Sequence, residues 1–114
     1  MHELSVAVAL LEQIGTVARE RQVKRVISAD LVVGTLAGVD PEALQFAFEI
    51  ASRDSAADGC RLAIRTVRPT LRCRACGVSS PAESSFAVCP GCGATDVVIE
   101  GGRELHLQSV EIEE

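Results

Sequence analysis

Four of the five cysteines lie in two CxxC pairs, and their spacing is the clearest chemical signal in the chain. The pairs read CRACG and CPGCG, and their cysteines are Cys73, Cys76, Cys89 and Cys92. Two residues between paired cysteines let both sulfurs of a tight turn point to one centre. Gly77 and Gly93, which follow the pairs, can adopt positive φ, so that backbone N–H groups can donate to the thiolates. Four such thiolates predict a closed tetrahedral site for a structural zinc ion.

Three other interpretations of these cysteines are weaker. A redox CxxC of the thioredoxin type needs a βαβ context, and none surrounds these pairs. An iron–sulfur cluster can use four cysteines, but two paired turns suit a zinc ribbon better. Two disulfides would require an oxidising compartment. The segment around the pairs has few large apolar residues, so we expect zinc to supply its folding energy.

The first five residues, MHELS, contain a second set of groups that can bind a metal. The terminal amine of Met1, the backbone nitrogen of His2 and the His2 imidazole can close two fused chelate rings, and Glu3 offers a further donor. Planar, nitrogen-rich donor sets favour Ni(II) or Cu(II). Most short motifs of this kind bind nothing, and chain termini are commonly frayed. The residues alone therefore leave two interpretations open, a nickel site and an ordinary terminus.

Composition narrows the function class. The chain has 114 residues, a net charge of −5, no Trp or Tyr and three Phe, so its core must be aliphatic. Phosphate binding needs a basic surface, and the acidic balance argues against nucleic acid as the main partner. No apolar run approaches the roughly 20 residues that span a membrane, and no signal peptide is recognisable. We expect a cytoplasmic binding protein rather than an enzyme, because the sequence shows no catalytic triad or phosphate-binding loop.

Apolar periodicity predicts the elements that position these groups. A helix is expected from Leu4 to Glu20, with its buried stripe at Leu4, Val8, Leu11, Ile14 and Ala18. A strand is expected over residues 23–33, with its covered face at Val23, Ile27, Ala29, Leu31 and Val33. A second helix should begin with Asp40 as N-cap and Pro41 as first residue. Its inner face is expected at Leu44, Ala47, Phe48 and Ala51.

A second strand is expected over residues 60–67, and strand character returns after the cysteine pairs. Apolar parity changes near Ser109, which predicts either a bulge or a switch in which face of the strand is covered. The predicted fold is therefore α+β, with two helices packed on a small mixed or antiparallel sheet and an inserted four-cysteine zinc-ribbon module. We expect a nickel-binding domain at 1–69 plus 98–114 and a zinc-ribbon domain at 70–97.

Several other residues have plain structural explanations. His106 is expected to be a solvated strand residue, and Cys60 a small buried apolar one. Asp40 is explained as a helix cap, with a second role near the nickel site or a partner surface as the alternative. Five arginines should form a solvated face, with docking of an acidic partner as the alternative: Arg61, Arg65, Arg68, Arg72 and Arg74.

Taken together, these segments resemble the hydrogenase nickel-incorporation proteins, the HypA/HybF family of metallochaperones. The resemblance rests on MHELS, on VVGTLAGVDPEALQFAFE, on the two cysteine pairs and on the closing GGRELHLQSVEIEE. It covers essentially the whole chain in order. A zinc ribbon is common to many families, but its combination with an N-terminal MHE is specific.

The resemblance implies a nickel site at Met1, His2 and Glu3 and a zinc site at the four paired cysteines. It also implies delivery of Ni(II) to the large subunit of [NiFe] hydrogenase, together with a GTPase maturation factor that handles nickel. Some family members serve urease as well. A histidine found beside the second cysteine pair in some members is replaced here by Gly93. The alternative function is a zinc-ribbon module that binds protein or nucleic acid and has no nickel role.

Overall fold

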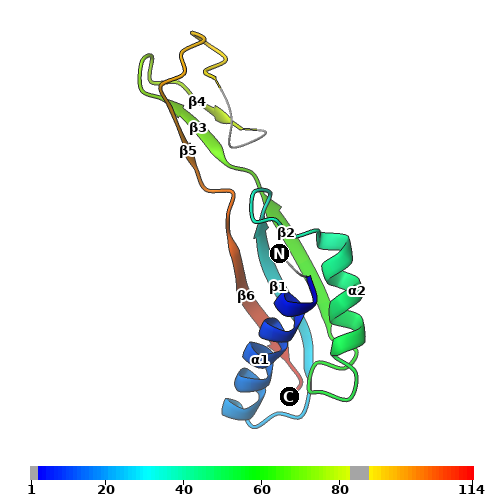
Figure 1. The fold of residues 1–114 in the computed structure, drawn as a ribbon. Helices are drawn as coiled ribbons and strands as arrows, with labels where there is room; N and C mark the ends of the chain where they lie inside the picture. The colour runs from blue at the N-terminus through cyan, green and yellow to red at the C-terminus, as the bar shows by residue number, and fades with distance from the viewer. Residues whose placement is uncertain (1–2, 83–87) are drawn as a thin grey trace.

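A computed structural model of the chain describes residues 3–82 and 88–114. Its elements, in order, are α1 (Glu3–Glu20), β1 (Val26–Gly34), α2 (Pro41–Ala51), β2 (Arg61–Val67), β3 (Thr70–Cys73), β4 (Ser79–Pro81), β5 (Val97–Glu100) and β6 (Leu105–Ile112). They form two three-stranded sheets arranged end to end in a long molecule of 55 × 24 × 16 Å (Figure 1). Among the described residues, no helix is both long and apolar enough to cross a membrane.

The larger sheet has the strand order β2-β1-β6 and is mixed. β1 pairs in parallel with β2, which it reaches through the crossover helix α2, and antiparallel with β6. Both helices lie on the same face of this sheet and pack against each other (Figure 1). The smaller sheet, β4-β3-β5, is antiparallel and carries the cysteine pairs at its far end. The predicted α+β class, with its two helices on a small mixed sheet, is confirmed.

The buried face of α1 differs from the predicted stripe. Its buried residues are Val6, Ala7, Leu10, Ile14 and Ala18. Leu4 and Val8, which were predicted to be buried, are 58% and 45% exposed. The first three turns are apolar on more than one side, so periodicity alone did not select a face, and packing against α2 and β6 did.

The start of β1 also departs from simple alternation. The pairing of β1 with β6 is irregular between Val26 and Ser28, and this shift reverses the side-chain parity. Val26 is consequently buried, whereas Ile27 is 43% exposed instead of lying on the covered face. The predicted residues Ala29, Leu31 and Val33 are buried in the core.

β6 contains the predicted change of parity. Asp30 pairs with Ser109 and Leu31 pairs with Leu107, so that Gln108 is an extra residue in β6. This bulge places the apolar residues before and after it on the same core-facing side: Leu105, Leu107, Val110 and Ile112. Of the two alternatives predicted near Ser109, the bulge is the one that the pairing shows.

Backbone contacts hold the two sheets together where their strands meet. Gly34 donates its N–H to the carbonyl of Glu104 at 2.7 Å, and Leu36 donates to the carbonyl of Gly102 at 2.6 Å. A Cβ atom on Gly34 would overlap the Gly102 backbone, and one on Gly102 would press on Pro69. Residues 98–100, which were assigned with the larger unit, pair with β3 in the smaller sheet.

Candidate metal centres

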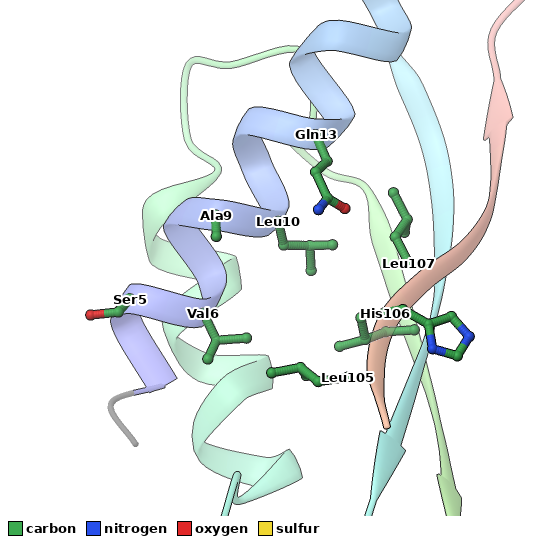
Figure 2. A pocket seen from close by; sticks show the side chains of 9 residues that line it. Ser5, Val6, Ala9, Leu10, Gln13, Leu105, His106 and Leu107 are labelled. Atoms are coloured by element: carbon green, nitrogen blue, oxygen red, sulfur yellow. The ribbon is translucent and has the colours of Figure 1, made fainter. Parts of the chain in front are cut away.

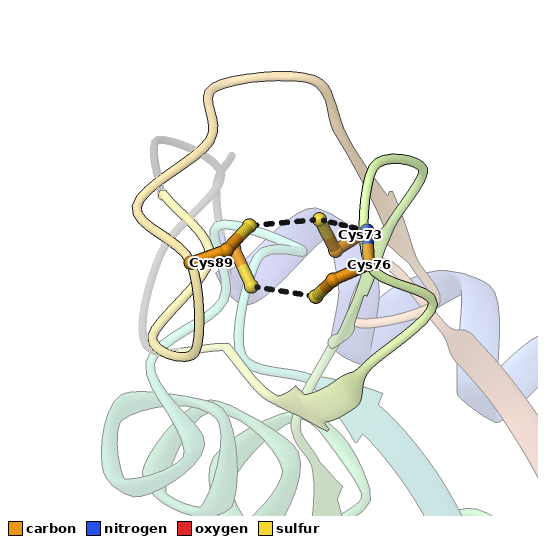
Figure 3. A group of neighbouring side chains, drawn as sticks. Cys73, Cys76 and Cys89 are labelled. Carbon is orange, nitrogen blue, oxygen red and sulfur yellow. Dashed lines mark hydrogen bonds between the residues drawn. The ribbon is translucent and has the colours of Figure 1, made fainter.

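The four paired cysteines converge at the tip of the smaller sheet (Figure 3). The Sγ atoms of Cys73 and Cys92 are 3.7 Å apart, those of Cys76 and Cys89 are 3.6 Å apart, and all four lie within 4.8 Å of one another. Zn–S bonds of about 2.3 Å place the sulfurs of a tetrahedral site about 3.8 Å apart. The separations therefore fit a zinc site with four cysteine ligands, and all four cysteines are free thiols rather than disulfides.

The two CxxC turns have the same local structure. In each, the N–H of the first cysteine donates to the carbonyl of the residue five positions later, at 2.9 Å. The carbonyl of that cysteine, Cys73 or Cys89, accepts from the glycine four positions later. These glycines, Gly77 and Gly93, have φ of 80° and 75°, a conformation that residues with a side chain adopt at a cost. The predicted positive φ at both glycines is confirmed.

Backbone donors lower the pKa of the first cysteine of each pair, Cys73 and Cys89, which are both buried. N–H groups of Cys92 and Gly91 lower the pKa of Cys89 to about 6, against the opposing effect of its burial. The backbone N–H of Cys76 likewise lowers the pKa of Cys73. Gly91 donates to Sγ of Cys89 at 3.3 Å, and Cys76 donates to Sγ of Cys73 at 3.4 Å. These are the donors predicted to stabilise thiolates.

The second cysteine of each pair, Cys76 or Cys92, is exposed and has a raised pKa. The backbone N–H of Val78 acts to lower the pKa of Cys76. Hydrogen bonds between the Cys76 sulfur and the sulfurs of Cys89 and Cys73 outweigh this effect and raise the pKa of Cys76 to about 12. The backbone N–H of Ala94 acts to lower the pKa of Cys92, but hydrogen bonds with the Cys73 and Cys89 sulfurs outweigh it and raise that pKa. The two contacts between sulfurs, Cys73 with Cys92 and Cys76 with Cys89, thus link the two CxxC turns where a cation would lie between all four sulfurs.

The N-terminal candidate site is described only in part. Met1 and His2 lie outside the described residues, whereas Glu3 begins α1. Its Oε2 accepts a hydrogen bond from the backbone N–H of Asp40 at 3.2 Å. Asp40 in turn caps α2, because its Oδ1 accepts from the N–H of Glu42 at 3.0 Å. The starts of the two helices therefore lie side by side, and their carboxylates face the positive ends of both helix dipoles.

The contact between Glu3 and Asp40 had only a general signal in the sequence. The predicted N-cap of α2 at Asp40 is confirmed, and its alternative role near the nickel site or a partner surface stays a prediction. Nothing local in the sequence pairs residues 37 positions apart. The proximity arises because α1 and α2 lie in parallel on one face of the sheet, with their N-termini at the same end (Figure 1).

The remaining single residues have structural roles. Cys60 is half-buried against the core, and burial raises the pKa of its thiol. His106 is exposed on the face of β6 opposite to Leu105 and Leu107, as expected. Among the arginines, Arg72 forms an ion pair with Glu100 at 2.8 Å, between two half-exposed side chains.

Comparison with known proteins gives a consistent result along the whole chain. Residues 1–112 match the family described as "Hydrogenase/urease nickel incorporation, metallochaperone, hypA". The chain is 42% and 43% identical, over 113 residues, to proteins named hydrogenase maturation factor HypA from Chlorobaculum parvum and Chlorobaculum tepidum. Each of these alignments covers 99% of this chain and 100% of the relative.

Solved structures agree with this result. The solution structure of the Ni metallochaperone HypA from Helicobacter pylori aligns with a TM-score of 0.68 and 25% identity, over 98% of this chain and 97% of that one. A second solution structure of a HypA protein aligns with a TM-score of 0.70 and 26% identity, over 99% of this chain and 97% of that one. The resemblance seen in the sequence is thereby confirmed, and the chain belongs to the HypA family of hydrogenase and urease nickel-incorporation metallochaperones.

Proposed function

We propose that this protein binds Ni(II) at its N-terminus and delivers it during the maturation of [NiFe] hydrogenase, while a zinc ion stabilises its distal end. The observation that carries the proposal is the bond between Glu3 and Asp40, which brings the starts of both helices together next to the chain terminus. This junction lies in a chain that matches a nickel-incorporation family from its first residue.

The proposed nickel ligands are Met1, His2 and Glu3. The terminal amine and the His2 nitrogens supply the planar donors that Ni(II) prefers, and Glu3 adds its backbone or its carboxylate. A dication is disfavoured at the positive end of a helix dipole. Deprotonated backbone nitrogens and the nearby carboxylates of Glu3 and Asp40 would offset that repulsion.

The proposed zinc ligands are Cys73, Cys76, Cys89 and Cys92. Zinc held by four thiolates has no open coordination position, so its contribution is structural rather than catalytic. It would displace the thiol protons and join the two CxxC turns. We also propose two folding units, one on each sheet, with Pro69 and the glycines 101 and 102 at their junction.

The proposed partners are the large subunit of [NiFe] hydrogenase and a nickel-handling GTPase maturation factor. Urease maturation proteins are further candidates, because the family description includes urease. A carrier must bind nickel tightly enough to collect it and weakly enough to release it. A micromolar dissociation constant, or about −8 kcal/mol, would meet both needs.

Calorimetric titration of nickel into three zinc-loaded proteins tests the proposal. The first has its native terminus, the second carries a few extra residues before Met1, and the third is His2→Ala. Extension converts the terminal amine into an amide, and the substitution removes the imidazole, so both should weaken nickel binding sharply. Zinc content and circular dichroism should stay unchanged, because the cysteine cluster lies in the other sheet.

The competing function makes a different prediction for the same proteins. A zinc-ribbon interaction module would retain one zinc per chain and bind no nickel after dialysis, whatever its terminus. If the extended and His2→Ala proteins both bind nickel like the native protein, the N-terminus is not the site. The nickel-carrier proposal would then fail at its centre.

A further inference from the structure

Both helices carry large apolar side chains that are exposed to solvent. Leu4 and Val8 of α1 are 58% and 45% exposed, and Phe46 and Ile50 of α2 are 66% and 44% exposed. Single exposed apolar side chains are ordinary on a protein surface, whereas a contiguous group of them marks an interaction site. Whether these four residues form one surface depends on which sides of the two helices they occupy.

On α1, the exposed pair lies on the side of the helix that faces α2. Ser5, Ala9 and Gln13 line an apolar groove of about 310 Å³ between α1 and β6, and so mark the β6 side of the helix (Figure 2). Successive residues are turned by about 100° around a helix, which puts Leu4 and Val8 on the other side of the buried stripe. That side lies next to α2, because α1 packs against β6 on one flank and against α2 on the other (Figure 1).

On α2, the exposed pair points outward. The Gln45 side chain donates from Nε2 to the carbonyl of Leu62 in β2 at 2.6 Å, and so marks the β2 side of this helix. Helix geometry turns Phe46 and Ile50 away from β2 and from the core, toward solvent above the helix pair. Both exposed pairs therefore contribute to the outer surface that the two helices share.

The two pairs also lie at similar heights along the helices. The bond between Glu3 and Asp40 sets the two parallel helices level at their N-terminal ends. At about 1.5 Å per residue, Val8 then lies about 8 Å along α1 and Phe46 about 9 Å along α2. Packed helix axes are about 8–10 Å apart, so these two side chains are neighbours. The apolar surface is about 14 Å long. We call it the helix-pair patch, and it consists of Leu4, Val8, Phe46 and Ile50.

The charged residues that flank the helix-pair patch are acidic. Glu12 stands one turn after Val8 in the α1 row, and Glu42 stands one turn before Phe46 in the α2 row, and both are exposed. The only basic residue in the two helices is Arg19, in the last turn of α1. Glu42 also suits the positive end of α2, but Glu12 lies in mid-helix, where the dipole does not explain it. The patch thus has a carboxylate at two opposite corners.

We propose that the helix-pair patch binds an amphipathic helix of a partner protein, whose apolar face is flanked by Lys or Arg at both ends. Such a helix binds through apolar anchors spaced by three or four residues, and two packed helices offer a matching surface. The length of the patch corresponds to about nine residues of the partner helix. The cations at its two ends would pair with Glu12 and Glu42 and fix its orientation.

The charges select this occupant over two others. An anionic lipid surface attracts basic segments, and the acidic flanks of the patch would be repelled by it. A second copy of this chain does not supply the required helix, because Arg19 is the only basic residue of α1 and α2 together. The proposal does not depend on nickel binding, so its test uses nickel-free protein.

Fluorescence anisotropy of a labelled peptide tests the apolar part of the patch. The peptide, of leucine and lysine in an amphipathic helical pattern of about 14 residues, should bind the zinc-loaded protein. Ile50→Ala should raise the dissociation constant about fivefold or more, and Phe46→Ala should do the same. Ile27→Ala is the matched control, because it is the same substitution of a side chain that is 43% exposed, in β1 and outside the patch. This control should stay within about twofold of the native value.

The same titration tests the charges. A peptide with glutamate in place of every lysine should bind at least about tenfold more weakly. Glu12→Lys should raise the dissociation constant of the lysine peptide about threefold or more. Glu20→Lys is the control, because it makes the same charge change at the last residue of the same helix, two turns beyond Glu12. All substituted side chains are exposed, and circular dichroism confirms that each variant is folded.

Several results would each overturn the proposal. The first is a native protein that does not bind the lysine peptide, and the second is equal binding of the lysine and glutamate peptides. The third is an equal effect of Ile50→Ala and Ile27→Ala, or of Glu12→Lys and Glu20→Lys. Binding to phosphatidylglycerol vesicles that is lost in Ile50→Ala would assign the patch to a membrane instead. Self-association that is lost in Ile50→Ala, measured by sedimentation without peptide, would assign it to a second copy.

Discussion

The carboxylate of Glu3 accepts a hydrogen bond from the backbone N–H of Asp40 at 3.2 Å and so joins the first turns of α1 and α2. The Asp40 side chain is itself engaged with the N–H of Glu42. Asp40 therefore donates through its backbone to one helix and accepts through its side chain from the other. This junction links the first turn of α1 to the loop that leads from β1 into α2.

Glu3→Ala should destabilise the protein modestly. The substitution removes the acceptor for the Asp40 N–H, and the bond is solvent-exposed, so a loss of about 1 kcal/mol or less in the free energy of unfolding is expected. Urea denaturation measures it. Glu12→Ala, at an exposed position on the same helix, is the control. Equal stability of the two variants would show that the bond contributes nothing.

Glu3→Gln should weaken nickel binding by several-fold at most, and less than His2→Ala, because it removes one of the carboxylates that offset the helix dipoles but keeps the backbone donor. The Glu3 carboxylate is already engaged by Asp40, so that Glu3 would contribute to nickel through its backbone, which the substitution preserves. Calorimetric titration beside His2→Ala makes the comparison. A loss as large as that of His2→Ala would identify the carboxylate as the ligand.

Cys73→Ala should abolish zinc binding and unfold the smaller sheet. The variant removes a buried thiol and leaves three sulfurs, in a sheet with little apolar burial of its own. Zinc analysis and amide exchange would follow the two sheets separately, and the larger sheet should keep its protection. Cys60→Ala, which lies outside the cluster, is the matched control and should keep its zinc. A smaller sheet that stays protected without zinc would refute the structural role.

Nickel should leave the protein before zinc as the pH falls. Its proposed donors include an amine and an imidazole with ordinary pKa values near 7.7–8.0 and about 6.5, so protons compete from neutral pH downward. Among the zinc ligands, Cys89 has its pKa lowered to about 6 and Cys76 has its pKa raised to about 12, so the expected resistance to acid comes from the closed set of four thiolates around zinc. Metal analysis after dialysis across a pH series decides the order. Zinc loss at a pH where nickel remains bound would contradict both assignments.

Gly34→Ala should destabilise the junction of the two sheets by about 2 kcal/mol or more, because its Cβ would overlap the Gly102 backbone rather than a flexible side chain. Thermal unfolding measures the loss. Gly15→Ala is the control, since its Cβ meets only the end of the Arg19 side chain and alanine favours the helix. Similar effects of both variants would show that the junction tolerates movement.

Local patterns in the sequence predicted most of the elements and one cysteine centre. The N-cap at Asp40, the two helices and the bulge near Ser109 depend on neighbouring residues, and each appears in the structure. The convergence of the two CxxC pairs was predictable as well, because it requires only that the short segment between them fold back on itself. Single-residue chemistry and spacing suffice for features of this kind.

Tertiary structure decided what spacing could not. The amphipathic pattern of α1 fitted more than one face, and contact with α2 and β6 left Leu4 exposed. The irregular pairing of β1 with β6 turned Ile27 outward, although alternation predicted it inside. The bond between Glu3 and Asp40 exists because a crossover connection returns α2 to lie parallel to α1. Each outcome depends on which surfaces meet across distant parts of the chain, and a periodicity of two or of 3.6 residues carries no information about that choice.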